Sequence, residues 1–280
     1  MEIRPTTVTA NGLEFGALTC GESGPLALCL HGFPDSAHTW DGLLPDLAAA
    51  GFRAVAPWMR GYAPTAIPPD GDYSMPALAS DANALHAALD GGADAVLIGH
   101  DWGAMTSYAA AVLAPERWKR LVTIAVPPPA IAANAFLDYQ QIKRSFYVFL
   151  FQTPLAEFAV AADDLAFIGN LWADWSPSYD ASSDLSHVKD ALRDPANLAA
   201  AISYYRSMFA GGIGPSESPE QPTLYLHGVQ DGAFGVDRVQ DTAAHLSADS
   251  RVEFVDGTGH FLHLEKPAEV NRLIVDWMTS

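Results

Sequence analysis

The stretch "LIGHDWGAMTSYAAA", residues 97–111, joins an apolar run to a turn and then to an alanine-rich segment. The apolar run predicts a buried strand, and the alanine-rich segment predicts a helix. Asp101 occupies the turn, with Gly99 and Gly103 on either side of it. A strand that passes directly into a helix is the basic unit of an α/β protein, so we expect the same alternation on both sides of this stretch.

The alternation is present over most of the chain. Strands are predicted at 13–21, 25–32, 52–58, 94–99, 119–127, 222–228 and 251–257. Helices are predicted at 39–51, 75–92, 104–116, 236–247 and 266–278. The pair Asn11-Gly12 predicts a β-hairpin at the start of the chain. Elsewhere the continuous apolar strands alternate with helices, which predicts a mostly parallel central sheet flanked by helices.

Residues 128–218 interrupt this alternation. They contain stretches rich in aromatic residues and alanine, such as "FLDYQQIKRSFYVFLFQ" and "AAISYYRSMF", and they show no clear strand pattern. The segments "VPPPA" and "GGIGPSESPEQP" bound them, and such Pro- and Gly-rich segments suit domain boundaries. We therefore predict an α/β core in two parts, residues 1–127 and 219–280, with a helical insertion at 128–218.

Composition and charge exclude several classes of protein. The 280 residues carry a net charge of −18, which should repel nucleic acid and anionic membranes. The two cysteines, Cys20 and Cys29, are too few for a disulfide framework or a metal site. No apolar run has the length of a membrane span, and the segment "MEIRPTTVTANG" lacks the pattern of a signal peptide. We expect a soluble, cytoplasmic protein.

The turn around Asp101 matches a motif of catalytic sites. Gly-x-nucleophile-x-Gly, after a strand and before a helix, is the pattern of a nucleophile elbow. The turn is strained, and side chains at Gly99 and Gly103 would collide with the neighbouring strand and helix. The following helix also directs its N-terminal N–H groups and positive potential toward the turn. Asp101 is therefore a candidate nucleophile rather than a simple helix cap.

Two later residues complete a possible triad. Asp231, in "LHGVQDG", and His260, in "VDGTGHFLHLEKP", each follow a predicted strand. Nucleophile, acid and histidine in this order are typical of α/β-hydrolases, and the carboxyl ends of parallel strands meet at one edge of the sheet. Asp237 and His263 are the competing choices. Asp231 itself lies in an Asp-Gly pair that is common in turns.

At this point the sequence resembles a known family. The segments "HGFPD" (31–35), "RGY" (60–62), "GHDWGA" (99–104) and "GHFLHLEKPAEV" (259–270) are similar to those of α/β-hydrolases of the epoxide hydrolase/haloalkane dehalogenase branch. The resemblance covers nearly the whole chain and implies an α/β-hydrolase fold with a helical cap. It also implies that Asp101 is the nucleophile, His260 the general base and Asp231 the acid that orients it.

Within this branch the sequence is most like the epoxide hydrolases. The "HGFP" segment implies an oxyanion hole formed by the backbone N–H groups of Phe33 and Trp102, and Phe33–Pro34 is a candidate for a cis bond. Haloalkane dehalogenases usually carry Asn or Glu at the position of Phe33, where they use a side-chain donor to hold halide. Fluoroacetate dehalogenases usually have Arg after the nucleophile, where this chain has Trp102.

Epoxide hydrolases also carry two cap tyrosines that protonate the epoxide oxygen. Tyr205, in "SYYRSM", and Tyr147, in "FYVFLFQTP", match their positions. Their neighbours Tyr204 and Tyr139 are the alternatives. His31 is expected to stabilise its loop. Four further aromatic residues are expected either to line the pocket or to join cap and core, and the sequence does not separate these roles: Trp172, Trp175, Phe136 and Phe149.

The sequence therefore predicts an epoxide hydrolase that needs no cofactor or metal. It would use water to open a small-molecule epoxide to a vicinal diol through an ester on Asp101. The alternatives are a haloalkane dehalogenase with the same triad and a ligand-binding homologue without activity. The ordered triad argues against the second alternative, because a binding pocket alone does not need one. The chain could be a monomer or a homodimer.

Overall fold

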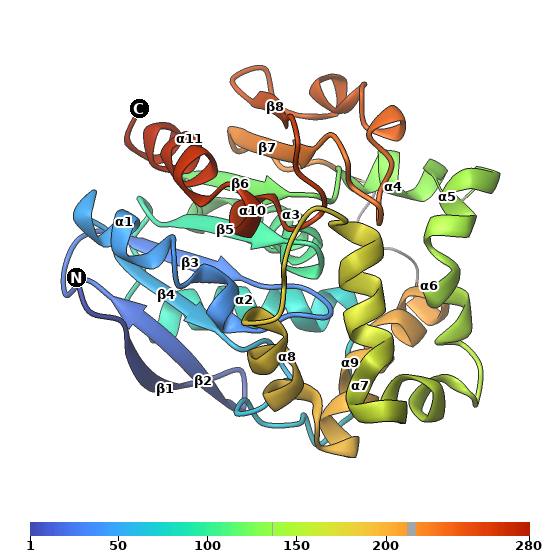
Figure 1. Cartoon of the computed structure of the whole chain (residues 1–280). Coiled ribbons are helices and arrows are strands. Elements are labelled where there is room, and N and C mark those ends of the chain that lie inside the picture. Colours follow the sequence, from blue (N-terminus) through green and yellow to red (C-terminus); the bar gives the residue numbers. More distant parts are fainter. Residues whose placement is uncertain (136, 212–216) are drawn as a thin grey trace.

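An eight-stranded sheet forms the centre of the protein (Figure 1). This computed structural model describes residues 1–135, 137–211 and 217–280. The strands are β1 (Arg4–Ala10), β2 (Leu13–Cys20), β3 (Leu26–Leu30), β4 (Arg53–Pro57), β5 (Val96–His100), β6 (Arg120–Ile124), β7 (Thr223–Gly228) and β8 (Arg251–Val255). Their order in the sheet is β1-β2-β4-β3-β5-β6-β7-β8. The hairpin β1–β2 and the pair β2–β4 are antiparallel, and the other pairs are parallel, as predicted.

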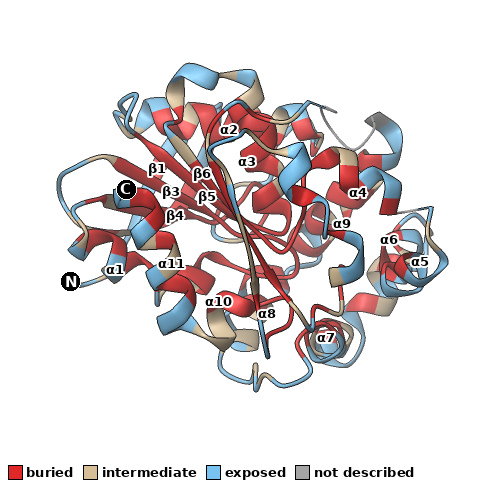
Figure 2. Ribbon diagram, turned by 90° about the horizontal axis from the view of Figure 1, so that it is seen from above, coloured by how far each residue is buried: buried red, intermediate tan, exposed pale blue. Residues whose placement is uncertain are grey.

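Helices cover both faces of the sheet. Figure 2 shows α2 (Met75–Ala88) and α3 (Trp102–Leu113) on one face, and α1 (Leu44–Ala49), α10 (Leu262–Glu265) and α11 (Pro267–Thr279) on the other. Every residue of β3 and β5 is buried between these layers. This double burial explains why the central strands read as continuous apolar runs in the sequence.

Helices also make up the insertion between β6 and β7. They are α4 (Pro129–Ala135), α5 (Tyr139–Arg144), α6 (Phe146–Leu150), α7 (Ala156–Trp175), α8 (Asp184–Leu192) and α9 (Pro195–Gly211). The chain leaves helical geometry at Ala162–Leu165, inside α7. Figure 1 places the insertion beside the carboxyl ends of the parallel strands. Residues 128–135, 137–211 and 217–218 contain no strand, as expected.

The predictions for two helices need correction. Residues 236–247 form two 3-10 helices, Val236–Arg238 and Thr242–His245, instead of one α-helix. The Val239 carbonyl accepts hydrogen bonds from both the N–H and the hydroxyl of Thr242, which favours a tight turn over α-helical pairing. Residues 39–51 are interrupted after a 3-10 helix at Ala37–Trp40, and α1 begins at Leu44 with Pro45 in its first turn. Proline is tolerated there because no helical N–H bond is required.

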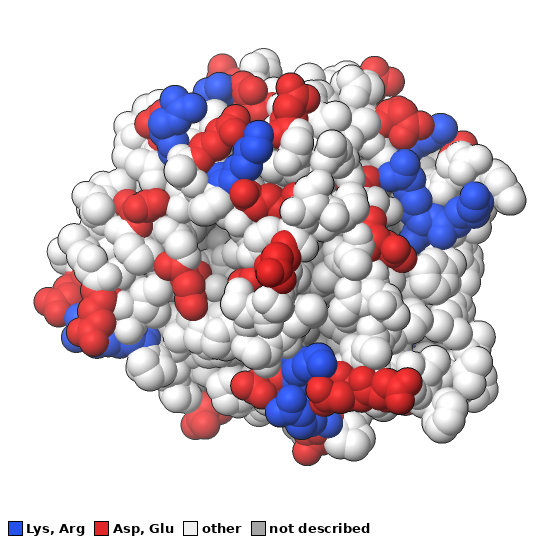
Figure 3. All heavy atoms as spheres, in the orientation of Figure 1, with Lys and Arg blue, Asp and Glu red and all other residues white. Residues whose placement is uncertain are grey.

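The molecular surface reflects the acidic composition. Figure 3 shows carboxylates spread over one face, with the basic side chains in small groups among them. None of the helices in the described ranges is long and apolar enough to cross a membrane.

The turn between β5 and α3 is strained and tightly enclosed. Asp101 has a φ of 53° and a ψ of −116°, which few residues other than glycine adopt. A Cβ atom at Gly103 would collide with the backbone oxygen of Leu30, and one at Gly99 would collide with the backbone of Gly103. Both predicted glycines are therefore required by contact with backbone atoms that cannot move aside.

Replacing Gly103 by alanine should destabilise the fold. The added methyl group would overlap the Leu30 backbone, and we expect a loss of about 3 kcal/mol in the free energy of unfolding. Urea denaturation of the wild type and Gly103→Ala measures this loss. Gly42→Ala is the control, because the nearest atom to its Cβ is Asn271 Nδ2 at 3.9 Å. Equal stability of both variants would contradict the steric explanation.

Candidate active site

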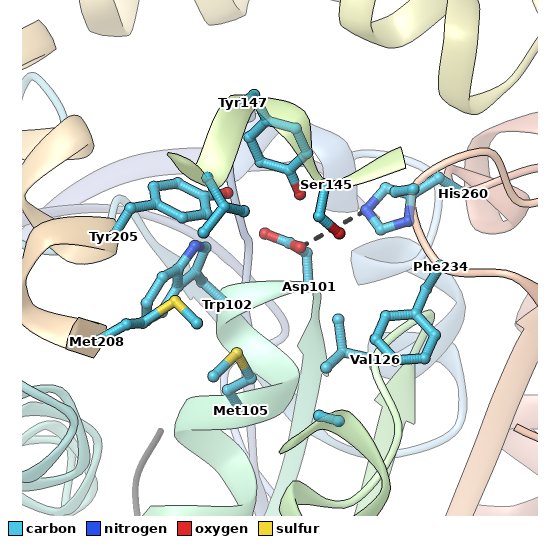
Figure 4. Close-up of a pocket in the computed structure, with 13 residues that line it drawn as sticks. Asp101, Trp102, Met105, Val126, Ser145, Tyr147, Tyr205, Met208, Phe234 and His260 are labelled. Carbon is cyan, nitrogen blue, oxygen red and sulfur yellow. Dashed lines mark ion pairs between the residues drawn. The ribbon is translucent and has the colours of Figure 1, made fainter. Parts of the chain in front are cut away.

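Asp101, Asp231 and His260 meet at the carboxyl ends of β5, β7 and β8. His260 Nδ1 lies 3.0 Å from Asp231 Oδ2, and His260 Nε2 lies 3.7 Å from Asp101 Oδ2. Figure 4 shows Asp101 and His260 facing each other. All three residues are buried, with 8% or less of each exposed. The structure therefore brings together the three residues of the predicted triad.

The loop after β7 fixes the Asp231 carboxylate. Its Oδ1 accepts the backbone N–H groups of Ala233 at 2.7 Å and Phe234 at 2.9 Å, which leaves Oδ2 for His260. Burial alone would raise the pKa of Asp231, but the charge and hydrogen bond of His260 lower it overall. Burial likewise opposes a charged His260, but Asp231 raises the pKa of His260 above its ordinary value. This pair is arranged to stabilise a positively charged imidazole.

Asp101 is held by the loop that follows β3. Its Oδ1 accepts the Phe33 N–H at 2.8 Å, and a Cβ at Gly32 would collide with the Asp101 side chain. Burial raises the pKa of Asp101, against the opposing effects of His260 and of the N–H groups of Phe33 and Trp102. His31 braces the loop: its Nδ1 contacts the Gly32 carbonyl and its Nε2 accepts the Met59 N–H, both at 2.9 Å. The Phe33–Pro34 bond is cis.

Both candidate tyrosines reach the same pocket from the insertion. Tyr147 comes from α6 and Tyr205 from α9, and Figure 4 shows their rings beside Asp101. The Tyr205 hydroxyl and His260 Nε2 are buried, and neither has a hydrogen-bond partner within the described residues. Burial and the nearby Asp101 raise the pKa of Tyr147, and burial, Tyr147 and Asp101 raise that of Tyr205. Both hydroxyls therefore keep their protons at neutral pH.

The alternative residues lie elsewhere. Tyr204 donates its hydroxyl to the Arg60 carbonyl at 2.8 Å, and Tyr139 is 70% exposed. His263 Nε2 contacts Thr39 Oγ1 at 2.6 Å. Asp237 pairs with its neighbour Arg238 at 3.1 Å, with 62% of its side chain exposed. None of these four candidates lines the pocket around Asp101.

The rest of the pocket is largely apolar. Besides Asp101, His260 and the two tyrosines, it is lined by Trp102, Met105, Val126, Ala132, Ser145, Val148, Met208, Ala233 and Phe234. Three aromatic residues whose role the sequence left open, Trp172, Trp175 and Phe149, are not among them. Trp172 donates its indole N–H to the Pro34 carbonyl at 2.8 Å, and Phe149 packs against Phe209, while Phe136 lies outside the described residues.

Sequence reasoning missed one contact that supports the triad. The Trp175 carbonyl, at the end of α7, accepts the His260 N–H at 3.0 Å and the Gly232 N–H at 3.1 Å. The centroid of the Trp175 ring also lies 5.0 Å from that of the His260 ring and 5.1 Å from that of the Tyr147 ring. A backbone carbonyl leaves no signal in the sequence, so only the structure could identify it.

One buried cluster behind the triad has the atom types of a metal site. Ligand atoms of Asp35, His100 and His263 lie within 4.8 Å of one another. His100 Nε2 also lies 3.0 Å from the His260 carbonyl oxygen, so the cluster adjoins the triad. The sequence predicts that no metal or cofactor is needed, and that stays a prediction.

Comparisons with known proteins agree with this fold. The family described as "alpha/beta hydrolase fold" matches residues 25–267, and the chain belongs to it. "AB hydrolase superfamily protein YfhM" of Bacillus subtilis is 30% identical over 98% of this chain and 97% of its own length. Human "Epoxide hydrolase 4" is 30% identical over 94% of this chain and 75% of its own length. The structure titled "Epoxide hydrolase from an endophytic Streptomyces" superposes with a TM-score of 0.83 at 26% identity, over 99% of this chain and 95% of that one. The predicted fold class and the resemblance to epoxide hydrolases are confirmed.

The geometry predicts how His260 titrates. Its pKa should lie above the ordinary value of about 6.5, because Asp231 stabilises the charged ring. Asp231→Asn removes that charge and leaves the burial, so it should lower this pKa below that of the wild type. Ring-proton chemical shifts measured by NMR against pH test this. Asp237→Asn, on the exposed part of the same loop, is the control and should leave the His260 pKa unchanged. An unchanged His260 pKa in Asp231→Asn would contradict the electrostatic coupling between His260 and Asp231.

Proposed function

We propose that this protein is an epoxide hydrolase. One observation carries the proposal: the buried carboxylate of Asp101 shares an apolar pocket with the protonated hydroxyls of Tyr147 and Tyr205. A carboxylate can attack an alkyl carbon directly, and an acid nearby can protonate the oxygen that leaves. The relatives named epoxide hydrolases support the same assignment.

In the first step, Asp101 attacks a carbon of the epoxide. Its Oδ1 is occupied by the Phe33 N–H, so Oδ2 is the attacking atom. The C–O bond of the ring breaks, and its electron pair goes to the oxygen, which takes a proton from Tyr147 or Tyr205. The product of this step is a hydroxyalkyl ester of Asp101, and the tyrosine regains its proton from solvent.

In the second step, water cleaves the ester. His260 Nε2 takes a proton from the water, while Asp231 stabilises the charged ring through Nδ1. The water oxygen bonds to the ester carbonyl carbon, and the Phe33 and Trp102 N–H groups stabilise the resulting oxyanion. Collapse of this intermediate breaks the bond from the carbonyl carbon to the diol oxygen, which takes the His260 proton and leaves as the vicinal diol. The new Asp101 carboxyl group then releases its remaining proton to solvent, which restores the carboxylate.

We further propose that residues 128–218 form a cap domain. The helices α6 and α9 supply the two tyrosines that face Asp101, and α7 supplies the Trp175 carbonyl that holds His260. In this arrangement the cap provides the acid groups and the core provides the nucleophile and base. The apolar lining suits an epoxide with hydrophobic substituents.

Replacing His260 should trap the ester. In His260→Gln no base activates water, so Asp101 should be alkylated once and remain so. Mass spectrometry after incubation with excess epoxide should show a mass increase equal to one epoxide, located on the peptide that contains Asp101. His260→Gln/Asp101→Asn is the control and should gain no mass. The absence of any adduct at saturating epoxide in His260→Gln would count against the ester route.

The tyrosines distinguish this function from haloalkane dehalogenation. Phe33 offers no side-chain donor for a halide, whereas the tyrosine hydroxyls suit an oxygen leaving group. The variant Tyr147→Phe/Tyr205→Phe should slow epoxide opening by about 10²-fold or more. Stopped-flow measurement of Asp101 alkylation tests this directly, with Tyr139→Phe as the exposed control. Full epoxide activity in the double variant, or halide release from haloalkanes without diol from any epoxide, would overturn the assignment.

A further inference from the structure

Ser145 stands at the break between α5 and α6, and its hydroxyl has an unusual arrangement. It occupies the position just before α6, where serine commonly accepts a hydrogen bond from the first turn of the helix. Here the side chain makes no such bond. Instead Ser145 Oγ accepts a hydrogen bond from Gln141 Nε2 at 2.9 Å. The Ser145 hydroxyl is therefore not used as a helix cap, and its contacts lie elsewhere.

Gln141 determines which way the Ser145 hydroxyl bonds. Gln141 is 1% exposed, and its Oε1 accepts the Gly235 N–H at 3.2 Å. Its amide nitrogen therefore lies on the other side, where it donates to the Ala233 carbonyl at 2.8 Å and to Ser145 Oγ. Because Ser145 Oγ is an acceptor from Gln141, its own proton remains free, and no acceptor for it is found among the described residues.

The free proton is available to the pocket. Ser145 is 3% exposed and lines the same cavity as Asp101 and His260. Figure 4 shows its hydroxyl directed toward the space around these two residues. The neighbouring lining residues Val126, Val148 and Phe234 are apolar, so they offer this hydroxyl no alternative acceptor through their side chains.

We propose that Ser145, oriented by Gln141, forms a polar subsite that binds a hydrogen-bond acceptor of the substrate. The substrate class is an epoxide with an acceptor oxygen, such as an ether, close to the ring. This inference rests on the proposed epoxide hydrolase function and adds a preference within it. An all-carbon epoxide of the same shape leaves the buried donor without a partner, and that loss lowers its transition-state binding.

Two substrates of equal shape test the subsite. Butyl glycidyl ether and hexyloxirane differ only in an ether oxygen that replaces a methylene group. The wild type should have the higher kcat/KM for the ether. Ser145→Ala should lower kcat/KM for the ether by about fivefold, the effect of one neutral hydrogen bond, and leave that for hexyloxirane nearly unchanged. Ser186→Ala, on an exposed serine of α8, is the control and should change neither value.

The outcomes separate the subsite from the proposed function. A wild type that opens neither substrate, nor other epoxides, overturns both proposals. A wild type that opens both, with the same loss for both in Ser145→Ala, overturns the subsite and assigns Ser145 to the fold or to positioning the water. An unchanged kcat/KM for the ether in Ser145→Ala also overturns it. Selective loss for the ether, with unchanged thermal unfolding, supports it.

Discussion

The strained turn at Asp101 is the constraint on which the rest of the site depends. Its positive φ directs the carboxylate away from the sheet and into the space where the loops after β3 and β8 meet. A side chain at Gly99 or Gly103 would collide with backbone atoms, and one at Gly32 would collide with the Asp101 side chain itself. The strain is held by two buried elements, β5 and α3, whose packing stabilises a conformation that the isolated turn would not adopt. The Asp101 carboxylate thereby reaches both the Phe33 N–H and His260.

The insertion and the core both supply residues and contacts to the candidate site. Asp231 and His260 lie three and five residues beyond the ends of β7 and β8, so the sheet alone does not fix them. The Trp175 carbonyl accepts N–H groups from the loops of both residues. Trp172 also donates to Pro34, beside the proposed oxyanion hole. A movement of α7 would therefore shift the loops that carry Asp231, His260 and Pro34 together.

Burial gives the site its electrostatic character. Two carboxylates and one imidazole are buried together, so each depends on hydrogen bonds and on the others for its charge. A serine at the Asp101 position would have to lose a proton before attack, whereas a carboxylate is already anionic. Attack by a carboxylate on an alkyl carbon also creates an ester carbonyl, on which a histidine and an oxyanion hole can act. Under the proposed function, the aspartate at this corner allows the machinery of ester hydrolysis to be used on an alkyl substrate.

The sequence by itself determined the α/β alternation, the helical insertion, the elbow and the order of the triad. These features follow from local patterns: apolar periodicity, glycines beside Asp101, and polar residues just after strands. Only the tertiary structure decided that Tyr205 and not Tyr204 faces Asp101, because adjacent residues on a helix point about 100° apart and the rotation of α9 is set by packing. It also decided that the Trp175 carbonyl and the Ser145 hydroxyl reach the site. The contacts of Trp175 and Ser145 with the site join segments far apart in the chain. Neither the position of a backbone carbonyl nor the direction of a hydroxyl proton can be read from the amino-acid sequence.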